Sequence, residues 1–178
     1  EFAIRSGKKH LVVTDENISK DRLSIPIILA VGALQSYLVK KGLRKFISLN
    51  VRSSECLDTH YHAVLIGAGA TTVNPYLAVD SIFQRFEKGL FGKLSFDECV
   101  SRYIKSINDG LLKIMSKMGI SVISSYRGGL NFQSLGLSRM PPGKAALSFR
   151  ARRSRRIGAW KILPRLKAKA SARHFWRR

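Results

Sequence analysis

The stretch HLVVTDENISKDRLSIPIILAVGALQSYLVKKG, residues 10–42, decides the predicted fold. Its first five residues, 10–14, are a short β-branched run followed by acidic side chains, which predicts a buried strand with a polar end. A helix should begin near Ser24, with Pro26 tolerated in the first turn, where amides have no intrahelical acceptor, and should end at Gly42. A strand, a loop and a helix in this order form the unit of α/β folds.

The same alternation continues along the chain. Polar and apolar residues alternate at 46–52, as in a strand with one buried face, and the short apolar run AVLI at 63–66 predicts a further strand. Another apolar run at 120–123 is read as a strand before a turn and a brief helix at 131–137. The sequence therefore predicts an α/β fold, a mainly parallel sheet with covering helices.

Two longer helices are predicted from the residues that mark their starts and ends. Residues 74–89 carry a proline at the start, a glycine at the end and an amphipathic apolar pattern between them. Ser95 and Glu98 match the S-x-x-E capping box, and the apolar stripe that follows runs to Gly119. Core packing is the interpretation of the methionines in that stripe.

Positive charge is concentrated in the last forty residues. The chain of 178 residues has a net charge of +21, but residues 139–178 hold 14 of its 32 Lys and Arg and none of its 11 Asp and Glu. Residues 1–138 keep 18 basic and 11 acidic side chains, a net charge of +7. We therefore divide the chain into a folded part, 1–138, and an irregular basic tail, 139–178.

Composition excludes several classes of protein. Cys56 and Cys99 are too few for a disulfide framework and lack the CxxC spacing of zinc or iron-sulfur sites, so buried thiols are expected. The longest apolar run, 25–34, is too short for a membrane span of about 20 residues, which favours a soluble, cytoplasmic protein. Because the chain starts at Glu1 rather than Met, we interpret it as a fragment.

No catalytic, cofactor-binding or metal-binding residue is predicted. The glycines of the segment GAGATT, 67–72, invite comparison with the dinucleotide fingerprint, but the third glycine is missing and Glu87 lies too late in a helix to hold a ribose. The segment is expected to follow a strand and precede a helix, and a tight turn whose glycines serve backbone geometry alone explains them better. His60 and His62 would share one side of an extended segment, yet no third metal ligand stands nearby.

Lys117 and Arg127 are the remaining candidates for a site. Both lie near the apolar segment 120–123, where loops and helix starts could bind an anion. A solvated or interdomain salt-bridging role is the favoured alternative for both side chains.

One long segment carries a resemblance to a known family. GLLKIMSKMGISVISSYRGG, residues 110–129, closely resembles the large subunit of glutamate synthases, and LIGAGATTVNPYL, residues 65–77, resembles the same family. The likeness runs from about Lys9 to Arg139. It implies the α/β central domain that links an N-terminal glutaminase to a flavin barrel, in an enzyme that makes two glutamates from glutamine and 2-oxoglutarate.

That resemblance also implies cofactors and partners. FMN and a 3Fe-4S cluster would belong to the intact enzyme, with their binding residues downstream and the nucleophilic cysteine upstream, so the fragment alone should be inactive. Its partners would be the glutaminase and flavin-barrel domains of the same chain, and a small NADPH-dependent subunit or ferredoxin. No membrane partner is expected.

The basic tail does not resemble the family. Two interpretations of the tail and one alternative interpretation of the whole chain are open. One permitted codon choice for residues 158–164, displaced by one base, reads GLEDIA, a family-like peptide, so a reading-frame error near Arg139 is our hypothesis. Alternatively the tail is an arm that binds nucleic acid by releasing counterions, with Trp160, Phe175 and Trp176 stacking on bases. A nicotinamide-binding module is the third reading.

Overall fold

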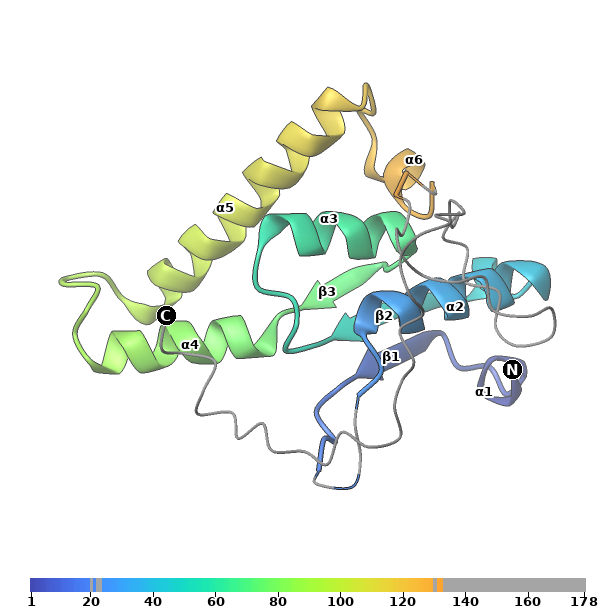
Figure 1. The fold of residues 1–178 in the computed structure, drawn as a ribbon, viewed down its shortest axis with the longest axis horizontal. Helices are drawn as coiled ribbons and strands as arrows, with labels where there is room; N and C mark the ends of the chain where they lie inside the picture. Colours follow the sequence, from blue (N-terminus) through green and yellow to red (C-terminus); the bar gives the residue numbers. More distant parts are fainter. Residues whose placement is uncertain (20, 22–23, 130, 133–178) are drawn as a thin grey trace, which may run out of the picture.

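The computed structural model describes residues 1–19, 21, 24–129 and 131–132 (Figure 1). The predicted α/β class is confirmed. In chain order the elements are α1 (Phe2–Arg5), β1 (His10–Thr14), α2 (Ile27–Lys40), the 3-10 helix η1 (Arg44–Phe46), β2 (Ser48–Arg52), α3 (Thr59–Ala68), β3 (Thr72–Asn74), α4 (Tyr76–Glu87), α5 (Phe96–Lys117) and α6 (Ile123–Tyr126).

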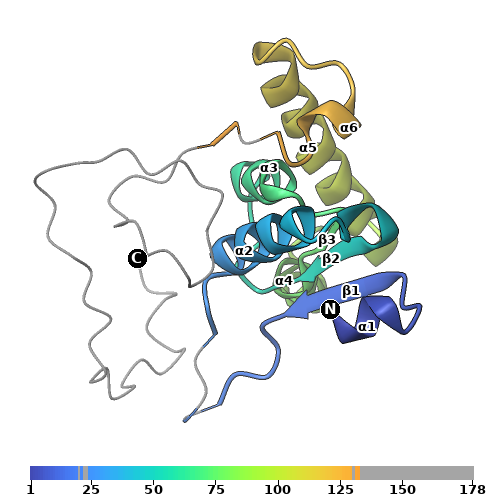
Figure 2. The same cartoon turned by 90° about the vertical axis from the view of Figure 1, so that its right-hand side faces the viewer.

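Three parallel strands form the sheet, in the order β1-β2-β3. His10 lies opposite Ser48 in the first pair, and Asn50 lies opposite Thr72 in the second. Because parallel connections in a sheet are right-handed, a sheet whose strands follow chain order carries its crossover helices on one face. Figures 1 and 2 show α2 and α3 side by side on the same side of the sheet.

The strands therefore have one apolar and one polar face. Leu49 and Val51 of β2 are buried, whereas the alternate residues of the sheet are more exposed. The predicted burial of the whole run 10–14 is wrong, since β1 also alternates and Val12 is 62% exposed. A β-branched run reads as buried on both faces only where both faces are covered.

The main core lies between the apolar face of the sheet and the two helices α2 and α3. It is built from eight buried residues: Ile27, Val31, Leu49, Val51, Cys56, Leu65, Ala68 and Ala70. Pro26 provides no side-chain cap for α2, but the carboxylate of Glu55 accepts a hydrogen bond from the amide of Ile27 at 3.2 Å. This contact satisfies one of the amides that a helix start leaves unpaired. The helix begins at Ile27, three residues after the predicted start.

Two predicted strands are wrong. Residues 63–66 lie in α3, which begins after Asp58, whose side chain accepts a hydrogen bond from the Tyr61 amide at 2.7 Å. A four-residue apolar run fits a buried helix as well as a strand, and here the N-cap decides. Residues 120–122 are irregular and Ile123 opens the short helix α6, because Ser125 and Tyr126 bond back to the carbonyl of Val122.

The two longer helices begin and end close to the residues that the sequence predicted as their starts and ends. Helix α4 starts after Pro75 and ends just before Gly89, and α5 starts after Ser95, whose hydroxyl accepts from the amide of Glu98 at 3.2 Å. Glu98 pairs with Arg102 at 2.9 Å, so only the serine half of the capping box is shown.

Most of α5 extends along the edge of the fold with much of its surface exposed (Figure 1). The core interpretation holds for Met115, which is buried, and is wrong for Met118, which is 41% exposed. In the part of the chain that the structure describes, no helix combines the length and apolar character needed to cross a membrane. Of the brief helix predicted at 131–137, residues 131–132 are not helical and the rest lies outside the described residues, as does the whole tail 139–178.

Candidate anion-binding pocket

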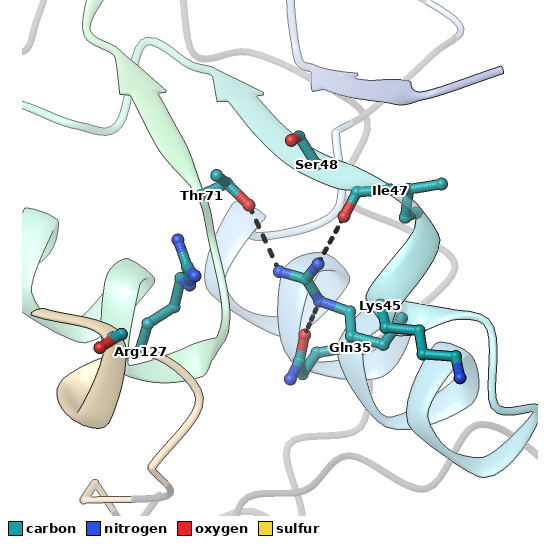
Figure 3. Close-up of a pocket in the computed structure, with 8 residues that line it drawn as sticks. Gln35, Lys45, Ile47, Ser48, Thr71 and Arg127 are labelled. Carbon is teal, nitrogen blue, oxygen red and sulfur yellow. Dashed lines mark hydrogen bonds between the residues drawn. The ribbon is translucent and has the colours of Figure 1, made fainter.

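A pocket of about 330 Å³ opens beside the amino-terminal ends of β2 and β3 (Figure 3). Three segments far apart in sequence contribute to it: the α2–β2 region, the connection into β3, and the α6 turn. Its lining consists of Gln35, Arg44, Lys45, Ile47, Ser48, Thr71, Ser124 and Arg127. These eight residues include three cations and no carboxylate.

Arg44 is fixed in the pocket by four hydrogen bonds to neutral oxygens, three of which are drawn in Figure 3. Its Nε donates to Gln35 Oε1 at 2.5 Å, and its Nη1 donates to the carbonyl of Ile47 at 2.7 Å. Its Nη2 donates to the carbonyl of Gly69 at 2.8 Å and to Thr71 Oγ1 at 3.3 Å. Burial, and then the positive charge of Arg127, lower the pKa of Arg44.

Arg127 is placed by the close approach of two glycine turns. The amide of Gly128 donates to the carbonyl of Ile66 at 3.2 Å, which joins the α6 turn to the end of α3. Gly128 has a φ of +71°, and a Cβ there would lie 2.9 Å from Gln35 Nε2 and 3.9 Å from Gly69 Cα. Glycine thus lets these two turns and Gln35 pack together. In the view of Figure 3, Arg127 and Lys45 lie on opposite sides of the pocket.

Of the two predicted site residues, only Arg127 lines the pocket. Lys117 is the last residue of α5, is exposed, and stands outside the pocket lining. Sequence reasoning missed Arg44, Gln35 and Thr71, because only the fold brings them to Arg127. The one available signal was the resemblance, since Thr71 and Arg127 lie in segments 65–77 and 110–129, which carry it.

Of the two glycines in residues 67–72, Gly67 lies within α3 and Gly69 lies between α3 and β3, so the expected tight turn is confirmed at Gly69 and its expected place after a strand is wrong. Gly69 ends α3 with a φ of +119°. A dinucleotide fingerprint needs the opposite order, a strand followed by the glycines and then a helix.

A second polar cluster lies at the carboxyl ends of β1 and β2. Asp15 is only 4% exposed and accepts hydrogen bonds from Ser53 Oγ at 2.6 Å, from the amide and hydroxyl of Ser54 at 2.9 Å, and from Tyr76 Oη at 3.0 Å. Burial raises the pKa of Asp15, but the hydrogen bonds from Ser53, Ser54 and Tyr76 outweigh it, and the pKa lies below its ordinary value. Glu16 points elsewhere, to Arg52 at 2.8 Å, so the adjacent acids do not act as a pair.

The histidines and cysteines assemble no metal site in the described part of the chain. His60 and His62 lie on α3 rather than on an extended segment, so two residues of helix turn them to different faces, and His62 Nδ1 bonds to the Asp58 carbonyl at 2.7 Å. Among the described residues, no three His, Cys, Asp or Glu side chains gather as a metal site. Both cysteines are buried thiols, as expected, and burial raises the pKa of Cys56 to about 12.

The fold and its pocket define a class: an α/β domain with a basic pocket. A family model described as the glutamate synthase central domain matches residues 1–138. The chain belongs to the glutamate synthase central domain family.

Similar proteins of known name agree with this assignment. The large chain of glutamate synthase [NADPH] from Azospirillum brasilense is 58% identical over 139 residues, which are 78% of this chain and 9% of that protein. The large chain of glutamate synthase [NADPH] from Bacillus subtilis (strain 168) is 44% identical over 139 residues, which again are 78% of this chain and 9% of that protein. Ferredoxin-dependent glutamate synthase 1, chloroplastic/mitochondrial, from Arabidopsis thaliana is 39% identical over 77% of this chain and 9% of that protein.

Proposed function

We propose that this chain is a structural, linking segment of a glutamate synthase large subunit. The intact enzyme would convert glutamine and 2-oxoglutarate into two glutamates with electrons from a reduced flavin. The observation that carries the proposal is the 58% identity over 139 residues to a large chain of that enzyme, of which the chain spans only 9%. Residues 1–138 form the proposed partial central domain, and the chemistry lies in other parts of the longer protein.

FMN and a 3Fe-4S cluster belong to this proposal only through the intact enzyme. A 3Fe-4S cluster needs several cysteine thiolates, and this chain has two cysteines, both buried in separate places: Cys56 in the main core and Cys99 near the start of α5. The pocket likewise lacks the apolar lining on which a flavin ring would pack, since seven of its eight residues, all except Ile47, are polar or charged, and none has an aromatic ring. We assign no residue of this chain to either cofactor.

The proposed partners are the glutaminase and flavin-barrel domains of the longer chain. A rigid segment between them would fix the distance and orientation of two active sites, and that geometric contribution can be large in catalysis. The proposal includes both electron donors, a small NADPH-dependent subunit or ferredoxin, because similar proteins carry both names. Cytoplasmic localisation is part of it, although the name of the Arabidopsis thaliana relative places that protein in organelles.

A segment exchange tests the proposed role. Residues 9–138 would replace the matching segment of the Azospirillum brasilense large chain, and glutamate formation from glutamine and 2-oxoglutarate would be measured. We expect the chimera to retain glutamate synthesis and the isolated 178-residue chain to have none. A chimera carrying Gly69→Val serves as the control for a distorted segment, and it should hydrolyse glutamine with less glutamate synthesis per ammonia released. A well-folded chimera without coupled synthesis argues against the linking role.

For residues 139–178 we propose a displaced reading frame near Arg139 rather than a nucleic-acid-binding arm. The similar proteins support the glutamate synthase reading and give the alternative no support. The DNA around this position, translated in all three forward frames, is the test. A family-like peptide in another frame is the expected result, and an intact gene without one refutes the displaced frame. Steeply salt-dependent DNA binding that is lost on truncation at Arg139 is the result that the arm requires.

A further inference from the structure

The pocket beside β2 and β3 carries positive charge that no described residue neutralises. Arg44, Lys45 and Arg127 line it, and in the described part of the chain neither arginine forms an ion pair. The four acceptors of Arg44 are neutral, so they orient its guanidinium without cancelling its charge. Two guanidinium groups of like charge facing one pocket favour an anion between them.

Several hydrogen-bond donors of the pocket have no acceptor among the described residues. A guanidinium has five N–H groups, and Arg44 uses four, which leaves one on Nη1. Thr71 Oγ1 accepts from the amide of Leu49 at 3.1 Å and from Arg44 Nη2, so its own hydroxyl hydrogen is left to donate elsewhere. The guanidinium of Arg127 donates to no described residue, which leaves its planar fork available.

We propose that this pocket binds a carboxylate group, held by the fork of Arg127, with the hydroxyl of Thr71 and the fixed charge of Arg44 beside it. The planar fork of arginine matches the two oxygens of a carboxylate, and such paired bonds are strong and directional. The fork of Arg127 pairs with both oxygens of one carboxylate, and the remaining Arg44 N–H and the Thr71 hydroxyl can donate to the same two oxygens. The pocket volume of about 330 Å³ is sufficient for a small acid or the end of an acidic side chain.

The carboxylate has two possible sources with the same chemistry. It is either a free small acid or an Asp or Glu side chain from another segment of the longer protein, and the second source rests on the proposed function. In both cases Arg127 is the binding group, because its placement depends only on the contacts of this chain.

Binding to the 178-residue chain is the first test. Arginine Nε–Hε resonances would be followed by NMR while acetate replaces chloride at constant ionic strength. We expect saturable shifts that report acetate binding, and an affinity roughly tenfold to hundredfold lower in Arg127→Gln. Arg85→Gln removes the same charge from the exposed surface of α4 and should bind acetate normally. Binding that is unsaturable, unchanged in Arg127→Gln, or tighter for phosphate than for acetate contradicts the proposal.

Chemical modification separates the two sources. Phenylglyoxal would be applied to the 178-residue chain and to the chimeric large chain, and the modified arginines identified by mass spectrometry. Protection of Arg127 in the chimera without acetate identifies a side chain as the carboxylate, whereas protection only by added acetate identifies a free acid. Reactivity of Arg127 in both proteins with and without acetate overturns the proposal. An inactive chimera would contradict the linking role and leave the acetate result on the isolated chain intact.

Discussion

Replacing Gly69 by alanine should lower the free energy of unfolding by about 2–6 kcal/mol, the sum of roughly 1–3 for backbone strain and roughly 1–3 for overpacking. Gly69 has a φ of +119°, which L side chains rarely adopt. An added Cβ would lie 2.5 Å from Cδ and Oε1 of Gln35. That side chain cannot turn away without losing its hydrogen bond from Arg44.

Circular dichroism at 222 nm during urea unfolding measures this effect. Tryptophan fluorescence is unsuitable, because both tryptophans lie in the tail, outside the described fold. Gly89→Ala is the matched control: its φ is +68° and nothing lies within 4 Å of its added Cβ, so it should cost only about 1–2 kcal/mol. Equal losses in the two variants would mean that the contact with Gln35 contributes nothing.

The same substitution links the stability of the turn to the pocket. Gly69 supplies a carbonyl to Arg44, and Gln35 supplies a second acceptor. A displaced Gln35 would therefore release the guanidinium that the pocket holds in place. The turn is therefore part of the architecture of the site.

The sequence predicts a structural feature correctly where the residues that determine it are neighbours along the chain. The start of α4 at Pro75, its end before Gly89 and the start of α5 after Ser95 are predicted correctly. Proline, glycine and a serine cap act through the backbone next to them. The apolar run 63–66 was assigned to the wrong element, since four residues do not distinguish the two periods and Asp58 was not recognised as a cap.

The pocket shows the limit of sequence reasoning more clearly. Arg127 was recognised as a candidate from its neighbourhood of loops and helix starts, but Lys117 was chosen by the same reasoning and lies outside the lining. What separates the two is the bond between Gly128 and Ile66, which brings the α6 turn against the end of α3. Such a contact between segments distant in sequence leaves no periodic pattern in either of them.

Replacing Asp15 by asparagine should lower the free energy of unfolding by about 2–4 kcal/mol at neutral pH, because hydrogen bonds to a charged group each contribute roughly 1.5–3. The carboxylate is nearly fully buried and accepts from Ser53, Ser54 and Tyr76, which joins the ends of β1 and β2 to the start of α4. An asparagine NH₂ would face some of these donors instead of accepting from them. Asp80→Asn, on the exposed surface of α4, should change stability by no more than about 0.5 kcal/mol.

The pH dependence of the same pair of proteins provides the sharper measurement. The pKa of Asp15 is lower in the folded protein than its ordinary value of 3.8, so its contribution to stability is fully present above that value and is lost as the pH falls through the folded pKa. Urea unfolding from pH 7 to pH 3 should therefore show the stability difference between wild type and Asp15→Asn shrinking below about pH 4. All other carboxylates are common to both proteins, so their titration cancels in the difference. If the stability difference between the two proteins stayed constant down to pH 3, the four hydrogen bonds of Asp15 would not depend on its charge.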